Sequence, residues 1–279
     1  LFSQRNKRVH PFKDDKILTA WNGLMIAALA YGARVLDENK YIEAAEKAIA
    51  FISTNLRRDD GRLLARYRDK EAAYLGYLDD YAFLVWGLIE LYQTTLKPTY
   101  LKLALDLSKD MLKYFWDETS GGFFLYGNDA KSLISRPKEI YDGATPSGNS
   151  VAAVNLIKLA RLTGNPEFEE KNQQQLKAFG GSVAKSPSGH SHFLMAVWLN
   201  HTAGTDITIV GNRQASDTQQ LLFVIINKFN PEAIITLKPL QPEENNLAQL
   251  APSIQNKHAI DGKATVHVCK DYSCHQPVN

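Results

Sequence analysis

The sequence predicts a mainly α-helical protein in which an inner and an outer layer of helices form part of a ring, followed by a small α/β part. Three observations lead to this fold class. Helical segments come in pairs, the first member of each pair is apolar almost all round, and the predominantly helical pattern gives way to strands with one helix after about residue 203. A helix that is apolar on every side is buried between neighbours, whereas an amphipathic helix lies outside.

Three helix pairs and a lone helix are expected in the first two thirds of the chain. The periodic segments are Thr19–Leu36 with Tyr41–Asn55, Asp79–Thr95 with Pro98–Phe115, Ser147–Thr163 with Pro166–Phe179, and then Gly189–His201. In the first segment small residues such as Ala27, Ala30 and Gly32 are interleaved with larger apolar ones, while Tyr41–Ile52 has a polar face. The first members therefore form the predicted inner layer.

The paired unit is repeated. Arg57–Asp69 follows the first pair and Trp116–Asp129 follows the second, and each contains an acidic turn, glycine and a short apolar strand. PSGNS at Pro146–Ser150 is echoed by PSGHS at Pro187–Ser191, each just ahead of an apolar helix. These matches suggest equivalent connections, although glycine and proline turns are common enough for chance to produce them.

The last part of the chain has a different pattern. Strands are expected at Thr205–Gly211, Ala233–Lys238 and Lys263–Cys269, with a helix at Ala215–Lys228. We therefore divide the chain into residues 1–203, part of an α/α ring, and residues 204–279, a small α/β subdomain. The first strand-to-helix turn lacks the Gly-x-Gly-x-x-Gly pattern, so no nucleotide is assigned to it.

Polar residues gather just before each inner helix. If the inner helices run in the same direction, these residues meet at one end, where free backbone N–H groups add donors and a positive dipole end. Such a bowl suits a ligand with many hydroxyl groups, and a carboxylate pair could supply an acid and a base. The proposed catalytic residues are Asp79, Asp80 and Asp142. The proposed substrate-binding residues are His10, Asp14, Asp15, Trp21, Asn22, Tyr77, Ser147, Asn149, His190 and His192.

Structural interpretations compete with these roles. Asp79, Ser147 and Asp15 fit the preference for N-cap positions. Trp21, Trp86 and Trp198 have large apolar side chains and are expected to lie in the core. A role as aromatic surfaces that stack against a sugar is the less favoured interpretation.

A second candidate site lies near the C-terminus. His267, Cys269, Cys274 and His275 provide four ligands within nine residues, as a zinc site would. The spacing between the cysteines is at the wide edge for zinc, so unligated thiols are expected there, and no metal or other cofactor is assigned to the chain.

The bulk composition excludes several functions. A net charge of +2 gives no electrostatic reason to expect a nucleic acid or an acidic membrane surface as partner. The longest apolar run, Tyr81–Ile89, is far too short to span a bilayer. With two cysteines and no visible signal peptide, a cytoplasmic location is expected. The chain begins with Leu1, so we expect it to be a piece of a longer protein.

Four long motifs resemble a known family. HPFKDDKILTAWNGLMIAALA (His10–Ala30), YLDDYAFLVWGLIELY (Tyr77–Tyr92), DGATPSGNSVAAVNLIKLA (Asp142–Ala160) and GKATVHVCKDYSCHQPV (Gly262–Val278) are similar to the thioredoxin-domain-containing family related to spermatogenesis-associated protein 20. The resemblance implies an N-terminal thioredoxin-like domain followed by an (α/α)6 toroid of the six-hairpin glycosidase type. This chain then corresponds to the C-terminal part, without the thioredoxin-like domain and the helices that complete the ring.

Two classes of function remain open. The first is a carbohydrate-active enzyme, either a hydrolase using a pair from Asp79, Asp80 and Asp142, or an epimerase or isomerase in which His10, His190 or His192 removes a proton next to a carbonyl. Two facing carboxyl groups would favour the former and two histidines the latter. The second is a non-catalytic scaffold that binds a partner or glycan and serves the upstream thioredoxin-like domain. Its carboxylates would be engaged in N-caps and salt bridges.

Overall fold

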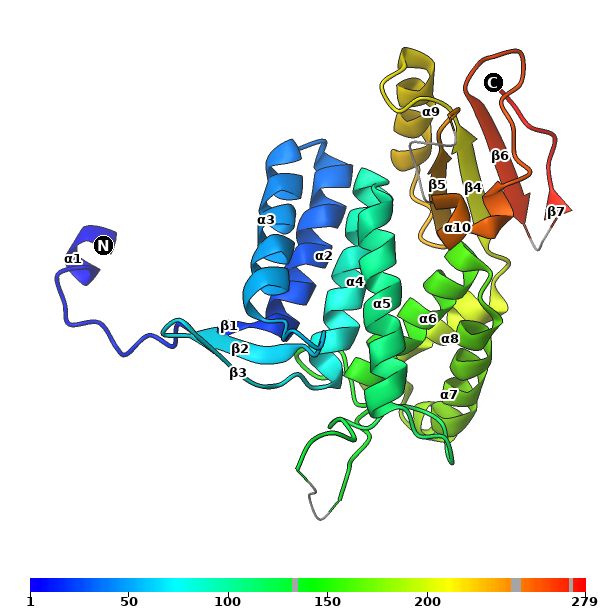
Figure 1. Ribbon diagram of the computed structural model, residues 1–279. Coiled ribbons are helices and arrows are strands. Elements are labelled where there is room, and N and C mark those ends of the chain that lie inside the picture. The colour runs from blue at the N-terminus through cyan, green and yellow to red at the C-terminus, as the bar shows by residue number, and fades with distance from the viewer. Residues whose placement is uncertain (132–134, 242–246, 271–272) are drawn as a thin grey trace.

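The structure of the chain is a computed structural model that describes residues 1–131, 135–241, 247–270 and 273–279. It confirms the mainly α-helical fold with a small α/β part (Figure 1). After the short helix α1 (Phe2–Arg5), an extended segment leads to the first helix pair and stands away from the helices in Figure 1. The pairs are α2 (Thr19–Leu36) with α3 (Asn39–Asn55), α4 (Leu78–Thr95) with α5 (Pro98–Phe115), and α6 (Gly148–Thr163) with α7 (Pro166–Lys185).

Helices α2, α4, α6 and α8 (Ser191–His201) form the inner layer. Helix α4 packs against α2 on one side and α6 on the other, and α6 packs against α8. Most residues of α4 are buried, as the apolar pattern predicts. The expectation of burial on all sides is wrong for α2, where Trp21, Met25 and Val35 are exposed. No helix within the described residues covers that face of α2.

Two glycines set the close approach of α2 and α4. A Cβ atom on Gly23 would lie 2.5 Å from the backbone carbon of Phe83, and one on Gly87 would lie 2.8 Å from the carbonyl oxygen of Gly23. Larger residues would push the two helices apart. This contact fixes the beginnings of α2 and α4 next to each other, which matters for the site described below.

A small antiparallel sheet lies beside the beginnings of these helices. It consists of β1 (Ile17–Leu18), β2 (Leu64–Arg68) and β3 (Glu71–Leu75) in that order. Asp69 and Lys70, at the turn between β2 and β3, both have positive φ, as a two-residue hairpin turn requires. The expected strand after the second pair is only an isolated bridge between Trp116 and Phe123. It corresponds to the bridge between Arg57 and Leu63 after the first pair, which supports the predicted repeat.

The C-terminal sheet has the order β5–β4–β6–β7. β4 (Thr205–Val210) is parallel to β5 (Ala233–Lys238), with α9 (Ser216–Ile226) between them in the chain. β6 (Thr265–Lys270) is antiparallel to β4, and β7 (Ser273–Cys274) pairs with β6. The sheet is tied to the helices by Gln93 of α4, whose side-chain amide donates to the carbonyl oxygen of Ile235 (3.1 Å) and accepts from its N–H (2.9 Å).

The expectation of free thiols is wrong. Cys269 and Cys274 form a disulfide, because they are opposite each other in the antiparallel β6–β7 pair, with Cα atoms 3.9 Å apart. Among the described residues no cluster of three or more His, Cys, Asp and Glu side chains is placed to hold a metal ion.

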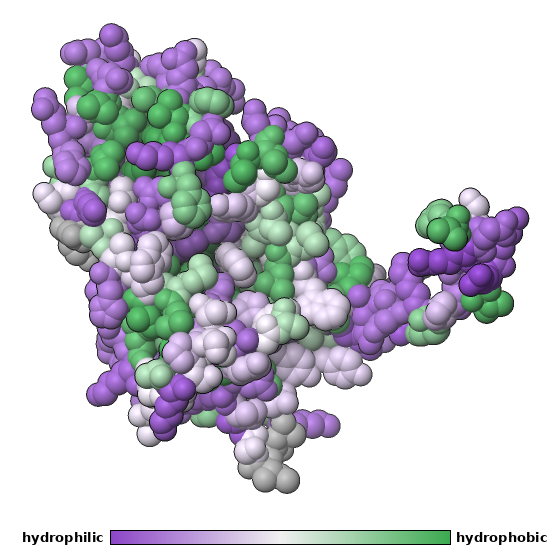
Figure 2. Space-filling model, turned by 180° about the vertical axis from the view of Figure 1, so that it is seen from behind, coloured by the Kyte–Doolittle hydropathy of each residue, from purple (hydrophilic) through white to green (hydrophobic). Residues whose placement is uncertain are grey.

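None of the helices of the described chain combines the length and the apolar character that a membrane span requires. Seen from behind, the surface has several hydrophobic areas separated by hydrophilic ones (Figure 2).

Candidate functional site

The four inner helices begin at one end of the helical layer, and three aspartates link their first turns. Asp80, in the first turn of α4, is the first link. One of its carboxylate oxygens accepts the N–H of Tyr77, the N-cap residue of α4, at 2.8 Å, and the other accepts the N–H of Ala20 in α2, also at 2.8 Å. Asp80 therefore stabilises the beginnings of two neighbouring helices at once.

Asp142 makes the corresponding link between α6 and α8. Its Oδ1 accepts the N–H of Ser147, the N-cap residue of α6, at 2.9 Å. Its Oδ2 accepts the N–H groups of His192 (2.8 Å) and Phe193 (3.2 Å) in the first turn of α8. Three backbone donors thus converge on one carboxylate, at the positive ends of two helix dipoles.

Asp79 lies between α4 and α6. A Cβ atom on Gly148, the first residue of α6, would collide with the Asp79 carboxylate, so glycine is needed at this contact. Burial and the nearby charge of Glu139 raise the pKa of Asp79 to about 6, against the opposing effect of the Gly148 N–H. Of the three aspartates, Asp79 accepts hydrogen bonds from the fewest backbone N–H groups, and its carboxyl group titrates near neutral pH.

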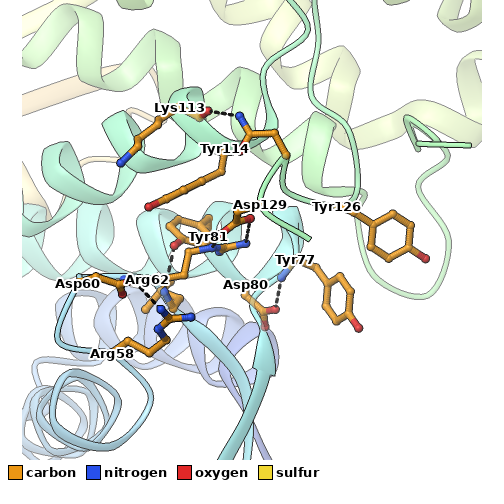
Figure 3. A network of polar contacts seen from close by, with 12 residues as sticks. Arg58, Asp60, Arg62, Tyr77, Asp80, Tyr81, Lys113, Tyr114, Tyr126 and Asp129 are labelled. Carbon is orange, nitrogen blue, oxygen red and sulfur yellow. Dashed lines mark hydrogen bonds and ion pairs between the residues drawn. The ribbon is translucent and has the colours of Figure 1, made fainter. Parts of the chain in front are cut away.

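The surroundings of Asp80 are shown in Figure 3. Burial raises the pKa of Asp80 to about 7, although its two backbone hydrogen bonds and the more distant charge of Arg62 oppose this. Arg62 is itself buried, with its Nε donating to Asp129 at 2.8 Å and its guanidinium 4.6 Å from the ring centre of Tyr114. These contacts hold the segment that precedes β2 against α5.

A second polar group lies on the inner helices and was missed by the sequence analysis. Glu90 of α4 accepts from Arg34 of α2 (2.8 Å) and from Lys158 of α6 (2.7 Å). Burial would raise the pKa of Glu90, but the two cations overcome this and lower it to about 2. The signal was present, because Glu90 is the one charged residue between Tyr81 and Tyr92, and a buried charge requires partners.

His192 combines burial with an unused nitrogen. Its ring centre lies 5.2 Å from that of Trp86 on α4, and its Nε2 is buried without a hydrogen-bond partner among the described residues. Burial lowers the pKa of His192 and Lys158 lowers it further, while Asp142 opposes both. The imidazole is therefore held neutral, with a free nitrogen between α4 and α8.

Apart from Trp21, the remaining predicted site residues fall into two groups. Four of them bond to nearby backbone: the side chain of Asn22 to Leu18, that of Ser147 to Ser150, that of Asn149 to Phe123 and Glu139, and Nδ1 of His190 to Ser186 at 2.7 Å. Ser147 is an N-cap, as the capping interpretation predicts.

Three of the predicted residues precede β1 and are not drawn into the group around the aspartates. His10 is exposed in the extended segment, Asp14 pairs with Lys16, and Asp15 pairs with Arg68 at 2.9 Å and is not a cap. The core interpretation is wrong for Trp21 and Trp198, which are 65% and 45% exposed.

Comparison with known proteins confirms the family resemblance. The whole chain matches spermatogenesis-associated protein 20 of Homo sapiens with 31% identity over 288 residues, and that of Rattus norvegicus with 30%. It also matches an uncharacterized protein of Caenorhabditis elegans with 29% identity. The chain spans 36% of the length of the human and rat relatives and 38% of the nematode one. No protein-family model matches the chain.

Similar solved structures confirm the toroid fold class. A cellobiose 2-epimerase from Bacillus thermoamylovorans superposes with a TM-score of 0.50 at 18% identity, over 61% of this chain and 46% of that one. A glycoside hydrolase of family 105 from C. acetobutylicum gives 0.50 at 14% identity, over 67% of this chain and 58% of that one. At these identities the likeness establishes the fold alone.

Proposed function

Because this chain is a relative of spermatogenesis-associated protein 20 and shares its fold with a sugar epimerase and a glycoside hydrolase, we propose that it binds and processes a carbohydrate where its inner helices begin. The observation that carries this proposal is Asp79. Its carboxyl group has a pKa of about 6 and lies at the junction of two helix beginnings. A carboxyl group that titrates near neutral pH can both donate and accept a proton during a reaction.

His192 is the proposed partner of Asp79. A neutral imidazole is suited to remove a proton from the carbon next to a sugar carbonyl. In this proposal His192 acts as the base and Asp79 as the acid.

Hydrolysis by a pair of aspartates has less support. Asp80 and Asp142 are occupied by two and three backbone N–H groups respectively, which leaves Asp79 as the freest carboxyl group of the three. We therefore place Asp80 and Asp142 as residues that position the helix beginnings. Epimerisation or isomerisation of a reducing sugar is the reaction class that these contacts favour.

A non-catalytic role is the second candidate. The engagement of Asp80 and Asp142 in N-caps is what a binding domain that serves a thioredoxin-like domain would also have. Under either function we propose that residues 1–203 hold the site and that residues 204–279 form a separate subdomain.

Solvent exchange distinguishes the two functions. The chain is incubated with cellobiose or mannose in D2O, and the NMR signal of the proton at carbon 2 is followed. We expect this signal to decay, and we expect His192→Gln and Asp79→Asn to slow the decay about 100-fold or more, the usual contribution of an acid or base. His201→Gln, an exposed histidine at the other end of α8, is the matched control.

If a sugar stabilises the chain but its proton at carbon 2 does not exchange with solvent, the binding function is favoured. The absence of both effects would contradict the proposal.

A further inference from the structure

A cavity of about 490 Å³ lies beside the proposed site, over the small sheet formed by β1, β2 and β3. It adjoins the helix beginnings, because Leu18, the N-cap residue of α2, and Tyr77, the N-cap residue of α4, both line it. Tyr77 also donates its N–H to Asp80. A ligand held at the helix beginnings could therefore extend into this cavity.

Three cations line the cavity, and one of them has no acidic partner. Lys16 is paired with Asp14, and Arg68 is paired with Asp15. Arg66 forms no ion pair with the carboxylates of the described residues, and its guanidinium lies 5.1 Å from the ring centre of Tyr74. Two acidic residues, Asp69 and Glu71, also line the cavity, but they lie at the hairpin end, next to and opposite Arg68.

Tyr74 is held in a conformation that tyrosine rarely adopts. It has a φ of 63° inside β3, between Ala73, which pairs with Arg66, and Leu75, which pairs with Leu64. A bulky side chain in this region costs of order 1 kcal/mol or more, and such strain is concentrated at functional sites. Its side chain is 65% exposed, so burial of the ring does not compensate for the strain. The conformation instead presents the ring to Arg66 and to the cavity.

We propose that this cavity binds the carboxylate of an acidic sugar residue, with Arg66 as the charged partner and Tyr74 and Tyr77 as aromatic contacts for the ring. The inference rests on the proposed function and names the class of its substrate. A guanidinium presents two parallel N–H donors that match the two oxygens of a carboxylate, and an aromatic face suits the apolar face of a sugar. The 490 Å³ volume lies within the range of small-molecule sites.

The test compares an acidic and a neutral disaccharide. Binding of digalacturonate and of cellobiose to the full chain is measured by calorimetry, with wild type, Arg66→Ala and Arg66→Lys. We expect digalacturonate to bind wild type at least 10-fold more tightly than cellobiose. Arg66→Ala should abolish that preference, and Arg66→Lys should restore only part of it, because lysine keeps the charge without the paired donors. Arg58→Ala is the matched control, since Arg58 is exposed and pairs with Asp60 away from the cavity.

A second variant tests the strain. Tyr74→Gly should raise the melting temperature, because glycine adopts positive φ freely, and at the same time weaken binding of digalacturonate. Lower stability with unchanged binding would show that the ring is only structural and would overturn its role.

Three outcomes overturn the wider inference. Equal affinity of wild type for both sugars would refute it while leaving the proposed function intact, and so would a preference that survives in Arg66→Ala. If neither sugar binds, this inference fails, and the proposed function is then decided by the exchange test with mannose.

Discussion

Replacing Asp79 with asparagine should make the protein more stable at neutral pH. In the folded chain burial and Glu139 hold the pKa of this carboxyl group at about 6, compared with 3.8 for an exposed aspartate. Because the folded pKa is raised, the folded state binds the proton more tightly than the unfolded state, and stability falls as the pH rises from about 4 to 6. At 1.4 kcal/mol for each pH unit, the difference corresponds to about 3 kcal/mol, which asparagine would recover above pH 7.

Urea denaturation at several pH values tests this reasoning. The gain in unfolding free energy of Asp79→Asn over wild type should be close to zero at pH 4 and approach its full value, up to about 3 kcal/mol, at pH 8. Asp59→Asn, a change at an exposed aspartate, serves as the control and should show no such trend. A gain that does not depend on pH, or a loss of stability at pH 8, would refute it. The same variant should lose the proposed exchange reaction, because a residue kept at an energetic cost is expected to serve function.

Three further predictions concern residues other than Asp79. Glu90→Gln should lower the unfolding free energy by about 3 kcal/mol at pH 7, because two partly buried cations lose their buried, charged partner. This loss should shrink as the pH falls from about 4.5 toward 2, and a loss below 1 kcal/mol at pH 7 would contradict the assignment. Asp142→Ala should cost about 1–2 kcal/mol and speed amide exchange at the start of α8; unchanged exchange there would argue against the cap. Alkylation of the unreduced protein should label neither Cys269 nor Cys274, and both after reduction, whereas labelling in freshly lysed cells would indicate that the reduced form prevails there.

The helices were predictable because their apolar periodicity and end signals are local. Thr19–Leu36 and Pro98–Phe115 were predicted with the bounds that the structure has, and the gathering of the helix beginnings followed from the alternation of inner and outer helices. The role of Asp80 was not predictable in detail, because its bond to Ala20 joins residues sixty positions apart. The same holds for the contacts of Glu90 with Arg34 and Lys158, which depend on how three helices face one another.

Other features could not be predicted from the sequence, because they depend on how strands pair. The β2–β3 hairpin carries no Asn-Gly or Asp-Gly turn, and its turn residues Asp69 and Lys70 do not signal positive φ. The disulfide required knowledge that the chain returns along β6 after Lys270. The exposure of Trp21 could not be predicted from the sequence either. A fully buried apolar helix and an apolar helix with one exposed face have the same composition.

The contact between Gln93 and Ile235 has a mechanical consequence for the whole chain. The side-chain amide of Gln93, in the last turn of α4, supplies the edge strand of the C-terminal sheet with both a donor and an acceptor, as a further strand would. Pulling the sheet away would leave four buried polar groups without hydrogen-bond partners at once. We therefore expect the tail to stay fixed to α4, and heat should melt both in a single cooperative transition.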